Sequence, residues 1–219
     1  MKSYAPALRI ICLTISFWQG YAIAEDDSKQ RANEAIQRMT FFRDEAAKLS
    51  SAEIFKELER QRNILALKSQ AKGFSLLMDD DSFKSSGYAA ALEDRQKNKE
   101  PSGAFYFGVY NWRLCSVMQG VDKGQLGDTV KDCWLQSLES FKLASSAQIP
   151  AASLNIARLY ENGWGVAPSK LVAAEWYVKA ANQYNGEGSR DEALSSVEAA
   201  LNLVPDHPAA LKLRSAMLK

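Results

Sequence analysis

A repeating pattern of apolar residues organises residues 151–182, which carry the clearest structural signal in the chain. In the first third of this stretch the apolar residues recur every three or four positions, which places them along one side of a helix. Gly163 and Gly165 then interrupt the pattern, and glycine ends helices readily because it adopts positive φ at low cost. The pattern resumes after Pro168, a residue favoured in first helical turns. The stretch therefore predicts two helices joined by a glycine turn.

Small residues in the second predicted helix would let it approach a neighbouring helix closely, and large aromatic residues would fill the space beside them. The small residues are Ala173, Ala174, Ala180 and Ala181, and the aromatic residues are Trp176 and Tyr177. Neither predicted helix can bury its apolar side alone. The unit is therefore expected to stack against similar units on both sides, as repeat proteins do.

This stretch resembles a Sel-one-like repeat of the tetratricopeptide superfamily. The matching positions are Ala152, Ala157, Leu159, Tyr160, Gly163, Gly165, Val166, Ala173, Trp176, Tyr177, Ala180 and Ala181. Two positions depart from the family pattern, since Ser169 replaces the usual aspartate after the turn and Tyr184 stands where a closing glycine is common. The resemblance implies an all-α fold, a right-handed α-solenoid of antiparallel helix pairs. It also implies a role in assembling protein complexes.

Weaker copies of the same unit are indicated before the central stretch. In residues 102–147, Ala144 lies 36 residues before Ala180, and a shift of that size is within the repeat periods of helical solenoids. These residues therefore predict a divergent earlier repeat. An enlarged, glycine-containing loop is expected at residues 119–132, between its two helices.

The pattern also continues from the central stretch to the end of the chain. A turn is predicted at residues 185–188, followed by a helix whose start carries a capping box formed by Ser189 and Glu192. A last helix, at residues 208–218, would cover the exposed end of the stack. His207 precedes it, and as the only histidine it is interpreted as a helix-start residue rather than a ligand or catalyst.

Residues 1–24 are typical of a secretory signal peptide. Their only charges are two basic residues, an apolar core runs from Ile10 to Trp18, and small residues precede a cleavage site after Ala24. The alternative is an uncleaved N-terminal anchor. We expect export and cleavage, which would place the protein in a bacterial periplasm or outside the cell, with no membrane span afterwards.

Two further helices are predicted after the signal peptide, at about residues 31–49 and 51–72. Ile36 belongs to the apolar stripe of the first helix. Ser50 and Glu53 have the spacing of a capping box at the start of the second. These helices would either cap the solenoid or form a dimerising hairpin. Capping is favoured because the apolar stripe does not persist over three heptads.

The densely charged residues 93–100 precede a proline and are interpreted as a linker into the repeat region. The predicted organisation after the signal peptide is therefore an N-terminal helical segment, residues 25–100, and a Sel-one-like/tetratricopeptide repeat domain, residues 101–219. This division is an expectation from composition and pattern alone.

Removal of the signal peptide would leave two cysteines, Cys115 and Cys133, in a chain of nearly balanced charge. In an oxidising compartment such a pair usually forms a disulfide, which we predict here. A pair of buried free thiols is the alternative. The balanced charge argues against a nucleic-acid-binding role.

No residue pattern points to catalysis, a metal site or a cofactor. The sequence offers neither metal-spaced histidines nor a Ser-His-Asp candidate set. Asp79, Asp80 and Asp81 are consecutive, whereas a calcium loop needs alternating ligands. The glycines of residues 119–132 lack the order of a phosphate-binding loop. We therefore expect a protein that is not an enzyme and that uses no cofactor or metal.

Polar residues on the two central helices are the predicted partner-binding residues. They are Asn155, Arg158 and Asn162 on the first helix and Glu175, Lys179 and Asn182 on the second. Such side chains could hydrogen-bond an extended peptide or pair with its charges, and an ordinary solvated surface is the alternative. Trp164, in the turn, would be either an exposed aromatic anchor or packed under the loop.

The predicted function is an exported scaffold that binds a partner protein or peptide on the concave face of a short helical solenoid. The alternative function is a cell-envelope hydrolase that acts on peptidoglycan, or a regulator of such an enzyme. The sequence names no partner and does not predict an oligomeric state.

Overall fold

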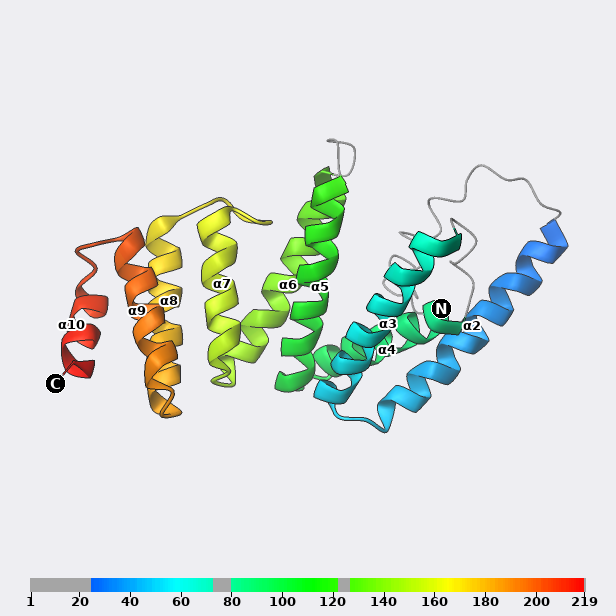
Figure 1. The fold of residues 1–219 in the computed structure, drawn as a ribbon, viewed down its shortest axis with the longest axis horizontal. Coiled ribbons are helices and arrows are strands. Elements are labelled where there is room, and N and C mark those ends of the chain that lie inside the picture. The colour runs from blue at the N-terminus through cyan, green and yellow to red at the C-terminus, as the bar shows by residue number, and fades with distance from the viewer. Residues whose placement is uncertain (1–24, 73–79, 122–126, 219) are drawn as a thin grey trace. The chain divides into compact units, whose positions relative to one another are not determined.

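The computed structural model describes residues 25–72, 80–121 and 127–218, which form α-helices joined by short turns (Figure 1). The helices are α2 (Glu25–Ala47), α3 (Ser51–Lys72), α4 (Asp80–Lys97), α5 (Pro101–Val121), α6 (Gly127–Ser146), α7 (Pro150–Asn162), α8 (Lys170–Gly186), α9 (Arg190–Leu203) and α10 (Pro208–Met217). The all-α prediction is confirmed for these residues. None of the described helices is long and apolar enough to cross a membrane. The chain divides into two compact units between Ala91 and Leu92, within α4.

The first unit packs α2, α3 and most of α4 around a small apolar core. Its buried apolar side chains include Ala46, Ile54, Leu58, Tyr88, Ala89 and Ala91. Gly87 of α4 lies so close to α2 that an added Cβ would be 2.7 Å from the backbone oxygen of Met39. Helices α2 and α4 therefore meet almost backbone to backbone, which only glycine allows at that position.

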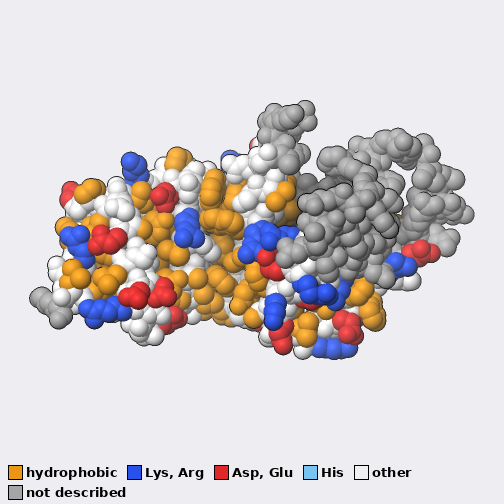
Figure 2. Space-filling view, viewed as in Figure 1, with side chains coloured by type: hydrophobic (Ala, Val, Ile, Leu, Met, Phe, Trp, Pro, Cys, Tyr) orange, Lys and Arg blue, Asp and Glu red, His pale blue; other side chains and the backbone are white. Residues whose placement is uncertain are grey.

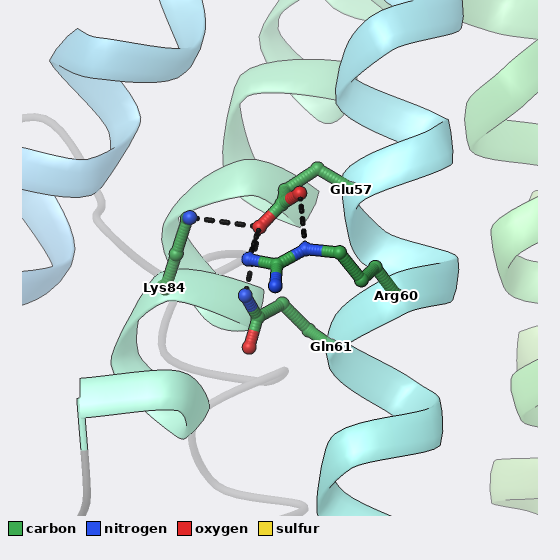
Figure 3. A network of polar contacts seen from close by, with 4 residues as sticks. All are labelled: Glu57, Arg60, Gln61 and Lys84. Carbon is green, nitrogen blue, oxygen red and sulfur yellow. Dashed lines mark hydrogen bonds and ion pairs between the residues drawn. The ribbon is translucent and has the colours of Figure 1, made fainter.

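A polar cluster joins α3 to α4 within the first unit (Figure 3). The Glu57 carboxylate accepts hydrogen bonds of 2.8 Å from Arg60 Nε and from Gln61 Nε2. It also lies 2.7 Å from the Lys84 ammonium of α4. The hydrogen bond from Arg60 is the largest influence that lowers the pKa of Glu57, to about 2, and Lys84 and Gln61 act in the same direction.

The N-terminal helices differ from the prediction in three places. Helix α2 begins at Glu25, so the helix includes residues that the sequence pattern leaves out. Ile36 is 51% exposed rather than inward-facing, while Ala46 of the same stripe is buried. Residues 93–97 belong to α4, so most of the predicted linker is helix.

Two of the three predicted helix-start interactions are present. Ser50 N–H donates to Glu53 Oε2 over 2.8 Å, and Glu53 N–H donates to Ser50 Oγ over 3.3 Å, which confirms that capping box. His207 Nδ1 accepts from Ala210 N–H over 3.3 Å, which confirms its role at the start of α10. The capping box predicted at Ser189 is wrong, because that side chain makes no capping hydrogen bond to α9.

In the second unit, helices α5 to α10 lie side by side in sequence order, and each runs antiparallel to the next (Figure 1). Alanine occupies many of the contacts. Fully buried alanines are Ala104, Ala144, Ala152, Ala157, Ala173, Ala174, Ala180, Ala181, Ala193, Ala200 and Ala210. Because a methyl group keeps neighbouring helix axes close, these positions explain the tight packing of consecutive helices.

A disulfide and three tryptophans hold the first half of this unit together. Cys115 of α5 and Cys133 of α6 form the predicted disulfide, with their Cα atoms 5.7 Å apart. Beside it, the rings of Trp134 and Trp164 stack with centroids 5.0 Å apart, and Trp112 meets both rings edge-on. Trp164 therefore packs under the turn, as one of its two predicted alternatives states.

The loop predicted at residues 119–132 is much shorter in the structure. Helix α5 continues to Val121 and helix α6 already begins at Gly127. Gly120 lies in the last turn of α5 and Gly127 is the first residue of α6.

The turn between α7 and α8 needs its glycines. Gly163 caps α7 with φ at 70°, and its N–H donates to Leu159 O. Gly165 has φ at 71°, and an added Cβ there would be 2.5 Å from Trp134 Cβ. The turn therefore combines a left-handed backbone with a close approach to α6, and both favour glycine.

Candidate functional site

An open pocket of about 410 Å³ lies among α7, α8 and α9 of the second unit. Its volume is within the range of roughly 300–1,000 Å³ that is typical of small-ligand pockets. Lining residues come from all three helices: Leu154, Arg158, Tyr177, Tyr184, Asp191, Glu192, Ser195, Ser196 and Ala199. The pocket exists because these helices are neighbours both in sequence and in space (Figure 1).

Two tyrosines of α8 line the pocket. Tyr177 and Tyr184 are seven residues apart, close to two helical turns, so they lie on the same face of α8. The Tyr177 hydroxyl donates a hydrogen bond of 2.6 Å to Glu161 Oε2. Burial, reinforced by Glu161, raises the pKa of Tyr177 well above its usual value, so this phenol stays a neutral donor.

The charges around the pocket are unevenly distributed. Arg158, on α7, is exposed, and Asp191 and Glu192, on the first turn of α9, are exposed as well. Acidic side chains at this position also interact favourably with the N-terminus of α9. The pocket therefore has a cationic group on its α7 wall and two carboxylates on its α9 wall.

The surface around α7 mixes apolar and charged side chains. Figure 2 shows hydrophobic side chains gathered over α7 and between α7 and α5, while acidic side chains stand near the lower ends of α8 and α9. Such a mixture of apolar area and charges at its edge is the usual anatomy of a surface that binds another protein.

Of the three predicted binding residues of α7, only one lines the pocket. Arg158 lines the pocket. The side-chain N–H of Asn162 donates a hydrogen bond of 2.9 Å to Arg158 O, so this amide is bonded within α7 itself. Asn155 is half-buried and is not among the residues that line the pocket.

The predicted residues of α8 lie away from this pocket. Glu175 and Lys179 are two positions either side of Tyr177, a rotation of about 200° around the helix, which places them on its opposite face. The Lys179 ammonium lies 4.6 Å from the centroid of the Trp176 ring. Asn182 donates to Val178 O over 3.0 Å. The two predicted polar stripes therefore do not converge on one site.

Of the nine residues that line the pocket, only Arg158 was predicted as a binding residue; the others include Tyr177, Tyr184, Asp191 and Glu192. The pair of tyrosines at a spacing of seven is visible in the sequence, and could have been found as an aromatic stripe. The acidic pair carries no such signal, because its place in the same pocket as Arg158 depends on how α7 and α9 both pack against α8.

Among residues 25–72, 80–121 and 127–218, no group of histidine, cysteine or acidic side chains is arranged to hold a metal ion. The expectation of no metal and no cofactor stays a prediction. Asp80 and Asp81 belong to the first turn of α4, while Asp79 lies outside the described residues.

No family model matches the chain, and neither a curated protein nor a solved structure is significantly similar to it. The resemblance to Sel-one-like repeats therefore rests on the residues of 151–182 alone. The function has to be argued from the pocket and the surface around it.

Proposed function

We propose that this protein is an exported, non-enzymatic scaffold that binds a segment of a partner protein in the pocket among α7, α8 and α9. The observation that carries the proposal is the pocket itself, which joins two tyrosines, one arginine and two carboxylates from three consecutive helices. Tyrosine and arginine are the residues most enriched where proteins bind one another.

The proposed architecture is a right-handed solenoid of Sel-one-like/tetratricopeptide helix pairs, covering residues 101–219. It is supported by the antiparallel order of α5 to α10, by the buried alanines between them and by the left-handed glycines after α7. Stacked helix pairs curve, and the first helices of the pairs would line the concave face. Arg158 of α7 would then project from that face.

The pocket suits a peptide segment because most of its polar side chains are exposed to solvent. Arg158, Asp191, Glu192 and Ser195 are exposed, and Tyr184 is only half-buried. Arginine and serine side chains can hydrogen-bond an extended peptide backbone, while Leu154 and Ala199 offer apolar contact.

Export is supported by the sequence of residues 1–24 and agrees with the disulfide between Cys115 and Cys133. Expression of the full chain in a bacterial host, followed by intact mass measurement of the protein in the periplasmic fraction, tests it. We expect a mass that corresponds to cleavage after Ala24. A full-length mass in the cytoplasmic or membrane fraction would contradict export.

Site-specific crosslinking in intact cells of the source organism tests the binding role. A photo-crosslinking residue at position 195, in the pocket, should capture one or a few defined proteins that mass spectrometry identifies. The same residue at position 139, on the exposed side of α6, is the matched control. Equal yields from the two positions would contradict the proposal.

Two single substitutions then separate the two predicted surfaces. Arg158→Ala removes the guanidinium donor from the pocket, and Lys179→Ala removes a cation on the opposite side of α8. We expect the first to reduce capture at position 195 and the second to leave it unchanged. Loss only with Lys179→Ala would move the binding surface to the other side of α8.

The two alternative functions, a peptidoglycan hydrolase or a regulator of one, remain predictions. The crosslinking experiment and the purified protein test them. A crosslinked partner that is itself a peptidoglycan hydrolase would identify this protein as a regulator. Release of soluble fragments from purified peptidoglycan by the protein alone would identify it as a hydrolase, and would overturn the non-enzymatic assignment.

A further inference from the structure

We propose that the pocket selects an extended peptide segment that carries a lysine or arginine, with the basic side chain seated against the α9 wall. This inference rests on the proposed function and narrows it to a ligand class. It follows from the charges on the two walls of the pocket, from the tyrosines between them and from the pocket's size.

The α9 wall attracts a cation. Asp191 and Glu192 are exposed, line the pocket, and form no ion pair among the described residues. A third carboxylate, Glu161 of α7, is held at the edge by its 2.6 Å hydrogen bond from Tyr177. Against these stands Arg158 alone, so the charged groups at the pocket sum to a negative value. Charge complementarity then favours a basic occupant.

The tyrosines strengthen the preference for a cation. The faces of aromatic rings attract ammonium and guanidinium groups, and do so more strongly where water is partly excluded. Tyr177 is buried and Tyr184 half-buried, and both line the pocket, so a cation beside them would be partly shielded from water. A basic side chain also brings an apolar stem, which can lie along Leu154 and Ala199.

Arg158 would orient the bound peptide in the pocket. Its guanidinium belongs to the α7 wall, whereas the carboxylates belong to the α9 wall, and it can donate to a backbone carbonyl or a carboxylate of the peptide. A peptide offers both an acceptor and a nearby basic side chain, whereas a free polyamine offers only the cations. Because the pocket contains both a guanidinium and carboxylates, it favours a peptide over a small amine.

A displayed library of random twelve-residue peptides, panned on the full chain, provides the test. We expect the selected peptides to be enriched in lysine or arginine, and one representative peptide would then be measured by fluorescence anisotropy. Selection of peptides without such enrichment would overturn this inference and leave the proposed function standing. Failure to select any peptide would count against the proposed function itself.

Charge exchange then places the basic residue on the α9 wall. The double variant Asp191→Lys with Glu192→Lys should bind the representative peptide at least about tenfold more weakly, because attraction becomes repulsion. Glu139→Lys, a charge reversal of equal sign on the exposed side of α6, should change binding less than about twofold. Circular dichroism of each variant shows whether it is folded.

A peptide in which glutamate replaces the basic residue is the decisive reagent, because it leaves the protein untouched. It should bind the native protein weakly and regain affinity for the doubly reversed variant. Equal affinity of both peptides for both proteins would overturn the inference. Spermidine should compete only weakly, and competition as strong as that of the peptide would show that the site is one for amines.

Discussion

The hydroxyl of Ser153 on α7 donates a hydrogen bond of 2.6 Å to the side-chain oxygen of Gln183 on α8, in the interior of the second unit. The amide nitrogen of Gln183 donates in turn to the backbone oxygen of Ser145 on α6, 3.1 Å away. The hydroxyls of Ser145 and Ser153 are themselves 2.6 Å apart. Three helices are thus tied by one buried amide, which fixes how they slide against one another.

Replacement of this amide is expected to be costly. Gln183→Leu would remove one acceptor of the Ser153 hydroxyl and one of the donors to the Ser145 backbone oxygen, which should lower the free energy of unfolding by about 1–3 kcal/mol. Urea unfolding followed by tryptophan fluorescence measures it, since Trp112, Trp134, Trp164 and Trp176 all belong to the second unit.

Asn182→Ala is the control for this substitution, because Asn182 is exposed and bonds only within its own helix. It should change the free energy of unfolding by less than about 0.5 kcal/mol. Combining Gln183→Leu with Ser153→Ala should cost less than the sum of the single changes. Additive costs would mean that the two side chains act independently.

Loss of the Cys115–Cys133 bridge should destabilise the second unit. The cysteines are 18 residues apart, and opening a loop of that length should lower the free energy of unfolding by about 3 kcal/mol through the gain in unfolded-chain entropy. The double variant Cys115→Ala with Cys133→Ala, compared with the oxidised protein by urea unfolding, measures this. Unchanged stability would indicate that the bridge adds nothing to the packing of α5 on α6.

Gly165→Ala should be among the most damaging single changes in the second unit. A positive φ costs alanine about 1–2 kcal/mol, and the added Cβ would also lie 2.5 Å from Trp134 Cβ. Gly188→Ala is the matched control, since φ is 80° there and nothing lies within 4 Å of the added Cβ. Thermal unfolding should therefore show a larger fall for Gly165→Ala. Equal falls would show that the contact with α6 is unimportant.

The Glu57 cluster should make the first unit sensitive to acid. Because the folded pKa of Glu57, about 2, is below its ordinary value of 4.5, the ionised carboxylate stabilises the folded state at neutral pH. That stabilisation is complete above about pH 5 and is lost as the pH falls towards 2. Thermal unfolding followed by circular dichroism, measured between pH 7 and pH 2.5, tests the direction.

Glu57→Gln identifies the responsible group. At pH 7 it should lower the free energy of unfolding by about 1 kcal/mol, a modest value because Arg60 is largely exposed. The difference between the variant and the native protein should shrink as the pH falls. A difference that stays constant down to pH 2.5 would assign the acid sensitivity to other carboxylates.

Much of the helical structure is predictable because it depends on residues near one another in the chain. The bounds of α3, its Ser50–Glu53 capping box and the role of His207 all follow from local spacing. The disulfide was predictable because only two cysteines remain after residue 24. None of these predictions depends on which helices are neighbours in space.

The errors arise where distant residues decide the outcome. Ile36 is 51% exposed although it belongs to the predicted apolar stripe, because Gly87 of α4 approaches α2 at Met39 and Phe42, further along the helix. The pocket could not be predicted for the same reason, since Asp191 and Arg158 line it together only because α7 and α9 both pack against α8. Tyr184, noted as a departure from the family pattern, lines the pocket instead.

The stacking of Trp164 on Trp134 makes the turn of one helix pair depend on a side chain of the pair before it. A fragment that starts at Pro150 would lose that indole partner and leave a hydrophobic ring uncovered. Any lengthening of the array by duplication between α6 and α7 would likewise have to supply a new aromatic surface on the inserted pair. Helices α7 to α10 are thus not expected to fold normally when they are separated from α6. We expect the two segments to be retained together in evolution.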